Sequence, residues 1–272
     1  LATVIASGRA SELRIVQVID ILENEPDWFL VSSNERRAAY PDVFRMNIMN
    51  GKTQLIQRNP GNVTNWFTDW DGKVVGAVFQ DDLKVGFKIL KDGQEDQWED
   101  VTSTRFDAHS FMPAGIKGDG KTGYVSSNLT PDGKPRDKAA IYEYNFQTKT
   151  FGELVYEHDE IDCCALIMNK KMRDMIGVAY MVGEPVQVYF DPTWKARMDA
   201  IDRALPDTFN SFTSLDDAET IGIVAASNST QPTKYYLFNF VKKTFKHLTD
   251  SRSEEHTSEL QSLTNLGFRQ RL

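Results

Sequence analysis

Hydrophobic positions along the chain follow a period of two far more often than a period of 3.6. The runs at residues 74–78, 141–146 and 235–240 show this pattern, and clusters of Gly, Asp and Asn separate them. A period of two is typical of β-strands, whose successive side chains point to opposite faces. The pattern therefore predicts a β-rich chain.

One pattern recurs at a regular distance. Residues 43–48, 141–146 and 235–240 can be superimposed, and each is followed by a turn and a Lys-Thr pair. Weaker copies fall between them, at residues 85–90 and 186–191. Because a weaker copy falls between each pair of matched residues, Asn47, Asn145 and Asn239 lie two units apart. Half of their spacing gives a unit of about 47–49 residues, which is the length of a propeller blade with four antiparallel strands. The sequence thus predicts an all-β fold, a partial β-propeller of about five blades.

A single segment departs from the β pattern. Between Pro192 and Pro206, apolar residues recur at helical spacing, with Asp191 as a possible start and Pro206 as a stop. We expect one amphipathic helix here that packs Trp194, Met198 and Ile201 onto the propeller. A docking surface for a partner is the alternative.

The chain is predicted to consist of residues 1–250 as the partial propeller and residues 251–272 as a non-native or disordered tail. From Arg252 to Ser262 the sequence resembles a translated sequencing adapter, and the β alternation stops. His256 is therefore left out of any candidate site.

The net charge of −8 disfavours binding to nucleic acid or to an anionic membrane. No apolar run reaches the length of a transmembrane helix, and the opening residues do not have the features of a signal peptide. These features do not decide between the cytoplasm and the periplasm.

Candidate chemistry is sparse, and we expect no catalytic, cofactor or metal site. Gly118-Asp-Gly-Lys-Thr-Gly123 has the spelling of a dinucleotide fingerprint, but it leads into a predicted strand instead of a helix, so a hairpin turn is favoured. No Gly-x-Ser-x-Gly motif is present. His109, His158, His247 and His256 lack metal-ligand spacing. Cys163 and Cys164 are adjacent, and on a strand their side chains would not easily bridge, so both are interpreted mainly as small buried hydrophobic residues.

Three stretches resemble the propeller of bacterial prolyl-oligopeptidase-family serine peptidases, in the branch that includes dipeptidyl and acylaminoacyl peptidases. The first is residues 58–63 with Trp66 and Asp71-Gly72, the second is residues 190–206, and the third is residues 235–248. The resemblance covers about residues 14–250. It implies a propeller that precedes an α/β-hydrolase domain, and that domain carries the catalytic Ser, Asp and His.

The resemblance further implies a non-catalytic role for this chain. The propeller would control the access of short peptides to the hydrolase domain of the same parent protein, and it would contact peptide substrate only indirectly. Because propellers of this family usually close with about seven or eight blades, we expect further blades before Leu1. The alternative function is a stand-alone propeller that binds a partner or ligand. The coding sequence beyond Asp250 distinguishes the two, because only the peptidase continues into a hydrolase domain.

Overall fold

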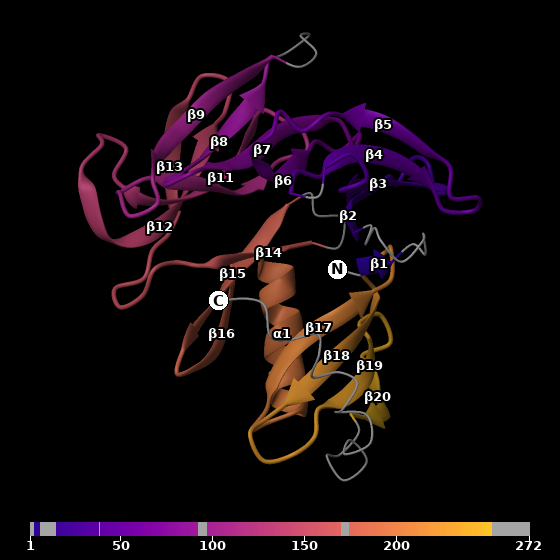
Figure 1. Ribbon diagram of the computed structural model, residues 1–272. Helices are drawn as coiled ribbons and strands as arrows, with labels where there is room; N and C mark the ends of the chain where they lie inside the picture. The colour runs from indigo at the N-terminus through magenta and orange to yellow at the C-terminus, as the bar shows by residue number, and fades with distance from the viewer. Residues whose placement is uncertain (1–2, 6–14, 38, 92–96, 170–173, 252–272) are drawn as a thin grey trace. The chain divides into compact units, whose positions relative to one another are not determined.

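The computed structural model describes residues 3–5, 15–37, 39–91, 97–169 and 174–251, which form five successive antiparallel sheets (Figure 1). The chain divides into two compact units, residues 1–166 and 167–272. No described helix is long and apolar enough to cross a membrane.

The first unit contains three sheets in chain order. The strands of the first sheet are β1 (Thr3–Ile5), β2 (Ile15–Ile21), β3 (Trp28–Ser33), β4 (Asp42–Asn47) and β5 (Thr53–Gln57). Those of the second are β6 (Val63–Thr68), β7 (Val74–Asp81), β8 (Lys84–Leu90) and β9 (Trp98–Arg105). The third contains β10 (Phe111–Ile116), β11 (Thr122–Leu129), β12 (Pro135–Asn145) and β13 (Thr150–Tyr156).

The second unit contains the helix and the last two sheets, apart from Ala165 and Leu166 at the start of the fourth sheet. The fourth sheet has three strands, β14 (Ala165–Met168), β15 (Met175–Val182) and β16 (Glu184–Tyr189). Helix α1 (Pro192–Ala204) follows at the position in the chain where the other sheets have their last strand. The fifth sheet contains β17 (Phe209–Leu215), β18 (Ile221–Ser227), β19 (Lys234–Asn239) and β20 (Thr244–Asp250). Five propeller blades with one helix are therefore confirmed, and the sheets have five, four, four, three and four strands.

The repeated sequence pattern corresponds to one strand of each sheet. The five copies fall on β4, β8, β12, β16 and β19, each of which is the next-to-last strand or, in the three-stranded sheet, the last. In the three strong copies, the matched Asn ends this strand and its Oδ1 atom accepts backbone N–H groups of the following turn. The donors are Met49 and Asn50 for Asn47, Gln147 and Thr148 for Asn145, and Lys242 for Asn239. The asparagine recurs because its short amide side chain satisfies the free N–H groups of the hairpin.

Each pair of neighbouring sheets in the first unit encloses a hydrophobic core. Between the first and second sheets, Leu30 and Val43 pack with Val63 and Trp66. Between the second and third, Phe87 meets an aromatic cluster that includes Phe146 (ring centroids 5.6 Å apart, interplanar angle 88°). The second sheet contributes to both cores, so its strands carry apolar side chains on both faces.

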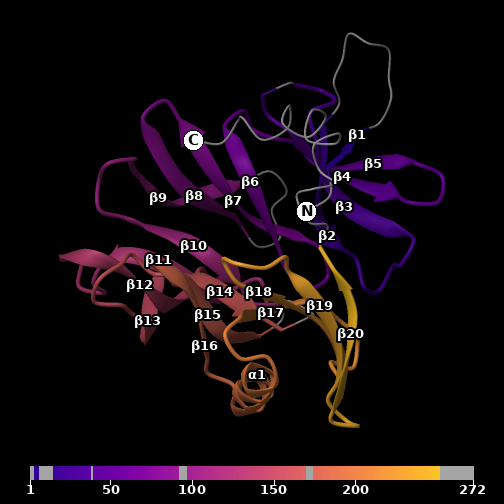
Figure 2. The same ribbon diagram turned by 90° about the horizontal axis from the view of Figure 1, so that it is seen from below.

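The helix lies where the apolar spacing predicted it. Asp191 caps it through a hydrogen bond from the Trp194 N–H to Asp191 Oδ1 (2.9 Å), and Figure 2 views it nearly along its axis, beside the fifth sheet. Trp194, Met198 and Ile201 are its buried residues, and the last two pack with Val224 and Phe238 of the sheet. The expectation that these three residues would fix the helix to the propeller is confirmed.

The expectation for the two cysteines was wrong. Cys163 and Cys164 are joined by a disulfide bond across a cis peptide bond. They lie in the connection between β13 and β14 and not on a strand. The alternation of strand side chains, on which the expectation depended, therefore does not apply to them. Cys163 itself is buried, as predicted.

Candidate functional site

The described histidines do not come together in a catalytic group. His109 follows β9, His158 follows β13, and His247 lies on β20, where its Nε2 atom is 2.6 Å from Asp250 Oδ1 in an exposed pair. Within the described ranges, no three His, Cys, Asp or Glu side chains are arranged to hold a metal ion. His256 lies outside the described residues.

The glycine-rich motif forms a hairpin turn, as the strand that follows it predicted. Gly120 has a φ of +64°, and β11 begins at Thr122, whose N–H and hydroxyl both donate to Asp119. Gly118 lies against the indole of Trp70, in the β6–β7 turn of the preceding sheet, and a Cβ at this glycine would come within 1.5 Å of the ring. The glycines thus allow a positive φ and a close approach between turns, and no helix N-terminus is present for a pyrophosphate.

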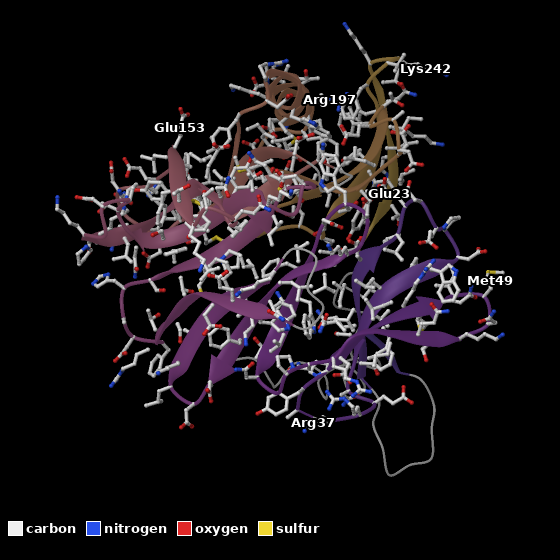
Figure 3. The ribbon with its side chains drawn as sticks, turned by 90° about the horizontal axis from the view of Figure 1, so that it is seen from above. Glu23, Arg37, Met49, Glu153, Arg197 and Lys242 are labelled. Carbon is white, nitrogen blue, oxygen red and sulfur yellow. A yellow bond between two sulfur atoms is a disulfide. The ribbon has the colours of Figure 1, made fainter. Side chains whose placement is uncertain are left out.

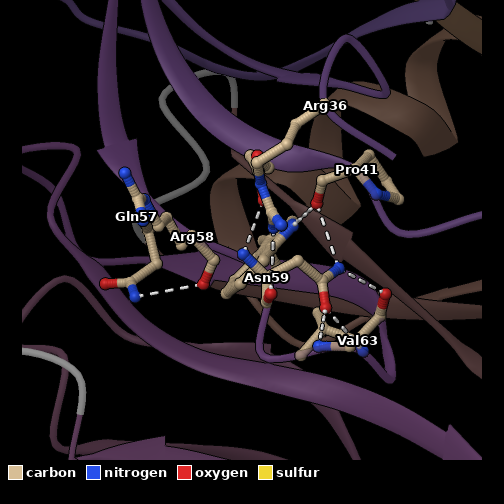
Figure 4. Close-up of polar contacts among 9 residues, drawn as sticks. Arg36, Pro41, Gln57, Arg58, Asn59 and Val63 are labelled. Atoms are coloured by element: carbon tan, nitrogen blue, oxygen red, sulfur yellow. Dashed lines mark hydrogen bonds and ion pairs between the residues drawn. The ribbon is translucent and has the colours of Figure 1, made fainter. Parts of the chain in front are cut away.

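A densely hydrogen-bonded polar group lies where the chain passes from the first sheet to the second (Figure 4). Asp42, at the start of β4, is only 1% exposed. It accepts two hydrogen bonds from the Arg36 guanidinium, each 2.6 Å, and one of 2.7 Å from the Asn59 N–H. A bidentate Arg–carboxylate pair is both strong and geometrically specific.

Asn59 closes the turn that follows. Its Oδ1 atom accepts the N–H groups of Gly61 and Val63 at 2.9 and 3.1 Å, and its Nδ2 atom donates to the carbonyls of Pro41 and Val63. The Pro41 carbonyl also accepts from the Trp66 indole (3.3 Å). The stretch from Arg58 to Val63 is one of the three that carry the resemblance, and this bonding accounts for its asparagine.

Electrostatics in this group favour a charged Asp42. Burial alone raises the pKa of a carboxyl group, but the hydrogen bonds from Arg36 and from the Asn59 N–H outweigh it and hold the pKa of Asp42 below its ordinary value. The Asp42 carboxylate is therefore committed to holding the loop and is not available as a general base. The Asp42–Arg36–Asn59 group can position a loop, but it cannot itself perform acid–base chemistry.

Lys88 is a buried cation within the second sheet. It is 7% exposed, and its Nζ atom lies 3.1 Å from Asn62 Oδ1 and 4.4 Å from the centre of the Phe79 ring. Burial lowers the pKa of Lys88 despite the nearby charges of Asp100 and Asp81. The protonated amine is thus held at a cost to stability.

We expect the substitution Lys88→Met to raise the free energy of unfolding at neutral pH by about 1 kcal/mol, because methionine fills the same space without a charge to desolvate. Since the native pKa lies below 10.5, the unfolded chain binds more protons, and wild-type stability rises with pH between the native pKa and 10.5. The advantage of the variant should therefore shrink as pH increases through this window. Urea unfolding of both proteins at several pH values measures this difference in the free energy of unfolding.

The exposed Lys52, in the β4–β5 turn, provides the control, because Lys52→Met should change stability by less than about 0.5 kcal/mol. A Lys88→Met variant that is destabilised at every pH would show that the charge of Lys88 contributes to stability.

A small cavity of about 310 Å³ lies in the second unit, next to Trp194. Its walls are mainly apolar, with the Gln187 amide and the Tyr189 hydroxyl (3.0 Å apart) among its polar groups. Burial, with a smaller contribution from Asp202, raises the pKa of Tyr189 to about 12, so this hydroxyl stays protonated at neutral pH. The cavity can accommodate a small apolar group, but these two side chains give it no general base.

The acidic loop around His158 is bonded to the third sheet. Glu157 pairs with Arg136, which also donates to the Tyr142 hydroxyl (2.9 Å), and Asp162 accepts the Ala139 N–H (2.8 Å). These contacts hold the loop against the third sheet.

Sequence reasoning missed two of these features. Nothing in the spacing of Arg36 and Asp42, six residues apart around a loop, indicates that they pair, and Lys88 lies on a strand where lysine usually faces solvent. The Arg36–Asp42 pair could have been suspected from the Asn-Pro-Gly turn, because the buried polar groups of that turn need hydrogen-bond partners. The burial of Lys88 was indicated in the sequence only by its apolar neighbours.

No protein-family model matches the chain. Among curated proteins, dipeptidyl aminopeptidase BIII from Pseudoxanthomonas mexicana is 24% identical over 254 residues, a match that covers 90% of this chain and 35% of the relative. The chain thus spans about a third of the length of that peptidase.

Solved structures with a similar fold include oligopeptidase B from Leishmania major, with 12% identity over 88% of this chain and 41% of that chain, and a TM-score of 0.48. The β-propeller domain of the Trilobed protease from Pyrococcus furiosus has 8% identity over 90% of this chain and 70% of that chain, and a TM-score of 0.39. These scores add nothing to the functional assignment. The match to the curated dipeptidyl aminopeptidase extends over 90% of this chain and bears out the expected resemblance to a dipeptidyl peptidase.

Proposed function

We propose that this chain is the non-catalytic propeller of a serine peptidase and that it limits the access of substrate to an α/β-hydrolase domain of the same parent protein. The match to dipeptidyl aminopeptidase BIII carries the proposal, because it extends over nearly the whole chain but over only 35% of the peptidase. The remaining length of that relative leaves room for a separate catalytic domain.

Two features of the described residues support this role. Five successive sheets follow the blade pattern, and a ring of blades offers a narrow passage and a broad face for a second domain. The polar group around Asp42 is also fully used in holding a loop. The parent protein would hydrolyse short peptides, while this part would exclude larger substrates by its shape.

Sequencing of the source locus with long reads, across the codons for residues 248–262, tests the first half of the proposal. We expect the adapter-like string to be absent and the frame to continue into an α/β-hydrolase domain with a Gly-x-Ser-x-Gly motif. If the adapter-like sequence is present in the genome and a stop codon follows it, the peptidase assignment is wrong and a stand-alone binding propeller is favoured.

The gating role is tested on the full-length parent protein. A dipeptidyl chromogenic substrate should be cleaved, while denatured casein should be cleaved far more slowly per accessible bond. Equal rates on both would overturn the gating role and leave the peptidase assignment intact.

A further inference from the structure

A groove with a volume of about 750 Å³ runs along α1 in the second unit. Its helical side presents Ala196, Ala200 and Ala204, which are spaced four residues apart and so share one face. These small side chains keep the wall low for about 12 Å along the helix axis. The groove is therefore elongated and parallel to α1.

The opposite wall belongs to the β19–β20 hairpin and is aromatic. Phe245 stacks on Phe238, with ring centroids 5.3 Å apart and an interplanar angle of 13°. Phe245 is 49% exposed, and Val241 at the turn is 73% exposed. Large apolar side chains that are this exposed and contiguous with a groove are typical of a binding surface.

The rim of the groove is positively charged, although the chain as a whole has a net charge of −8. Arg197, Arg203 and Lys243 line it, and among the described residues of the lining none is acidic. Arg197 is held in place between two rings, with its guanidinium carbon 4.6 Å from the Trp194 centroid and 4.7 Å from that of Phe240. Figure 3 labels Arg197 on the helix and Lys242 at the hairpin turn.

We propose that this groove binds an amphipathic, acidic helix of a partner protein. Aliphatic side chains of the partner at i, i+3, i+4 and i+7 would lie between the alanines and the phenylalanines, and flanking carboxylates would meet the three cations. The alanine spacing favours a helical occupant, because it allows two helix axes to approach closely along about two turns. This interaction surface goes beyond the proposed peptidase role and does not depend on it.

The test is a titration of the whole chain with a fluorescein-labelled synthetic helix of about five turns, with leucine on one face and glutamate on the other. A matched peptide has lysine in place of every glutamate. We expect saturable binding of the glutamate peptide, measured by anisotropy, and binding of the lysine peptide that is weaker by about tenfold or more. Added salt should weaken the first interaction.

Ala200→Glu places bulk and negative charge on the exposed helical wall of the groove and should weaken binding of the glutamate peptide by about tenfold or more. Ala108→Glu, the same change at an exposed loop residue outside the groove, should leave binding unchanged. Circular dichroism melts establish that both variants fold. Equal binding of the two peptides, binding unaffected by Ala200→Glu, or a dimer of this chain that Ala200→Glu dissociates would each overturn the proposal.

Discussion

Replacing Phe87 with alanine is expected to lower the free energy of unfolding by about 3–5 kcal/mol, the usual cost of truncating a fully buried aromatic residue. Phe87 is 1% exposed and makes edge contacts with Phe111 and Phe146, with ring centroids 6.0 and 5.6 Å away. It is the only fully buried member of this cluster contributed by the second sheet among the described residues, so its loss leaves a cavity between two sheets. Alanine there removes both apolar burial and aromatic contacts.

Phe106 provides a matched control in the same unit, because it is 64% exposed. Phe106→Ala should change stability by less than about 0.5 kcal/mol. Urea unfolding followed by tryptophan fluorescence is suited to both variants, since Trp28, Trp66, Trp70 and Trp98 lie in the first unit and Trp194 alone lies in the second. Similar losses for the two variants would show that the core between the second and third sheets is not closely packed.

The sequence predicted the blades because their signals are local. Asn145 ends a strand and caps its turn through its own side chain, and Asp119-Gly120 forms a hairpin whose geometry only a few residue types allow. The helix was predicted for the same reason, from its Asp191 cap and the spacing of its buried residues. Such features depend on neighbours within a few residues.

The contacts that hold one sheet to the next could not be predicted in this way. Thr68 of the second sheet donates to Asp20 of the first across 48 positions in the sequence (2.7 Å). Pairing at such distances is decided by which faces the sheets turn toward each other, and a period of two does not specify that. The Cys163–Cys164 disulfide was missed because a strand was assumed where the chain forms a connection.

The second large effect is expected for Asp42→Asn, which should cost about 2–4 kcal/mol at neutral pH. The substitution keeps the shape but removes the charge that accepts three hydrogen bonds, and it leaves the Arg36 guanidinium without its anion. Because the Arg36 side chain is 36% exposed, water can partly solvate it, and the loss should fall below that of a fully buried pair. The exposed Asp132, paired with Lys134, is the control, and Asp132→Asn should cost less than about 1 kcal/mol.

The pH dependence separates charge from packing at this position. The native pKa of Asp42 lies below the ordinary value of 3.8, so the unfolded chain binds a proton more readily, and the carboxylate stabilises the fold fully above 3.8. This contribution is lost as pH falls through the native pKa. The difference between wild type and Asp42→Asn should therefore be constant near neutral pH and should narrow below 3.8. A difference that persists unchanged in acid would show that the loss on substitution does not come from the charge of Asp42, and the ion pair with Arg36 would then contribute nothing to stability.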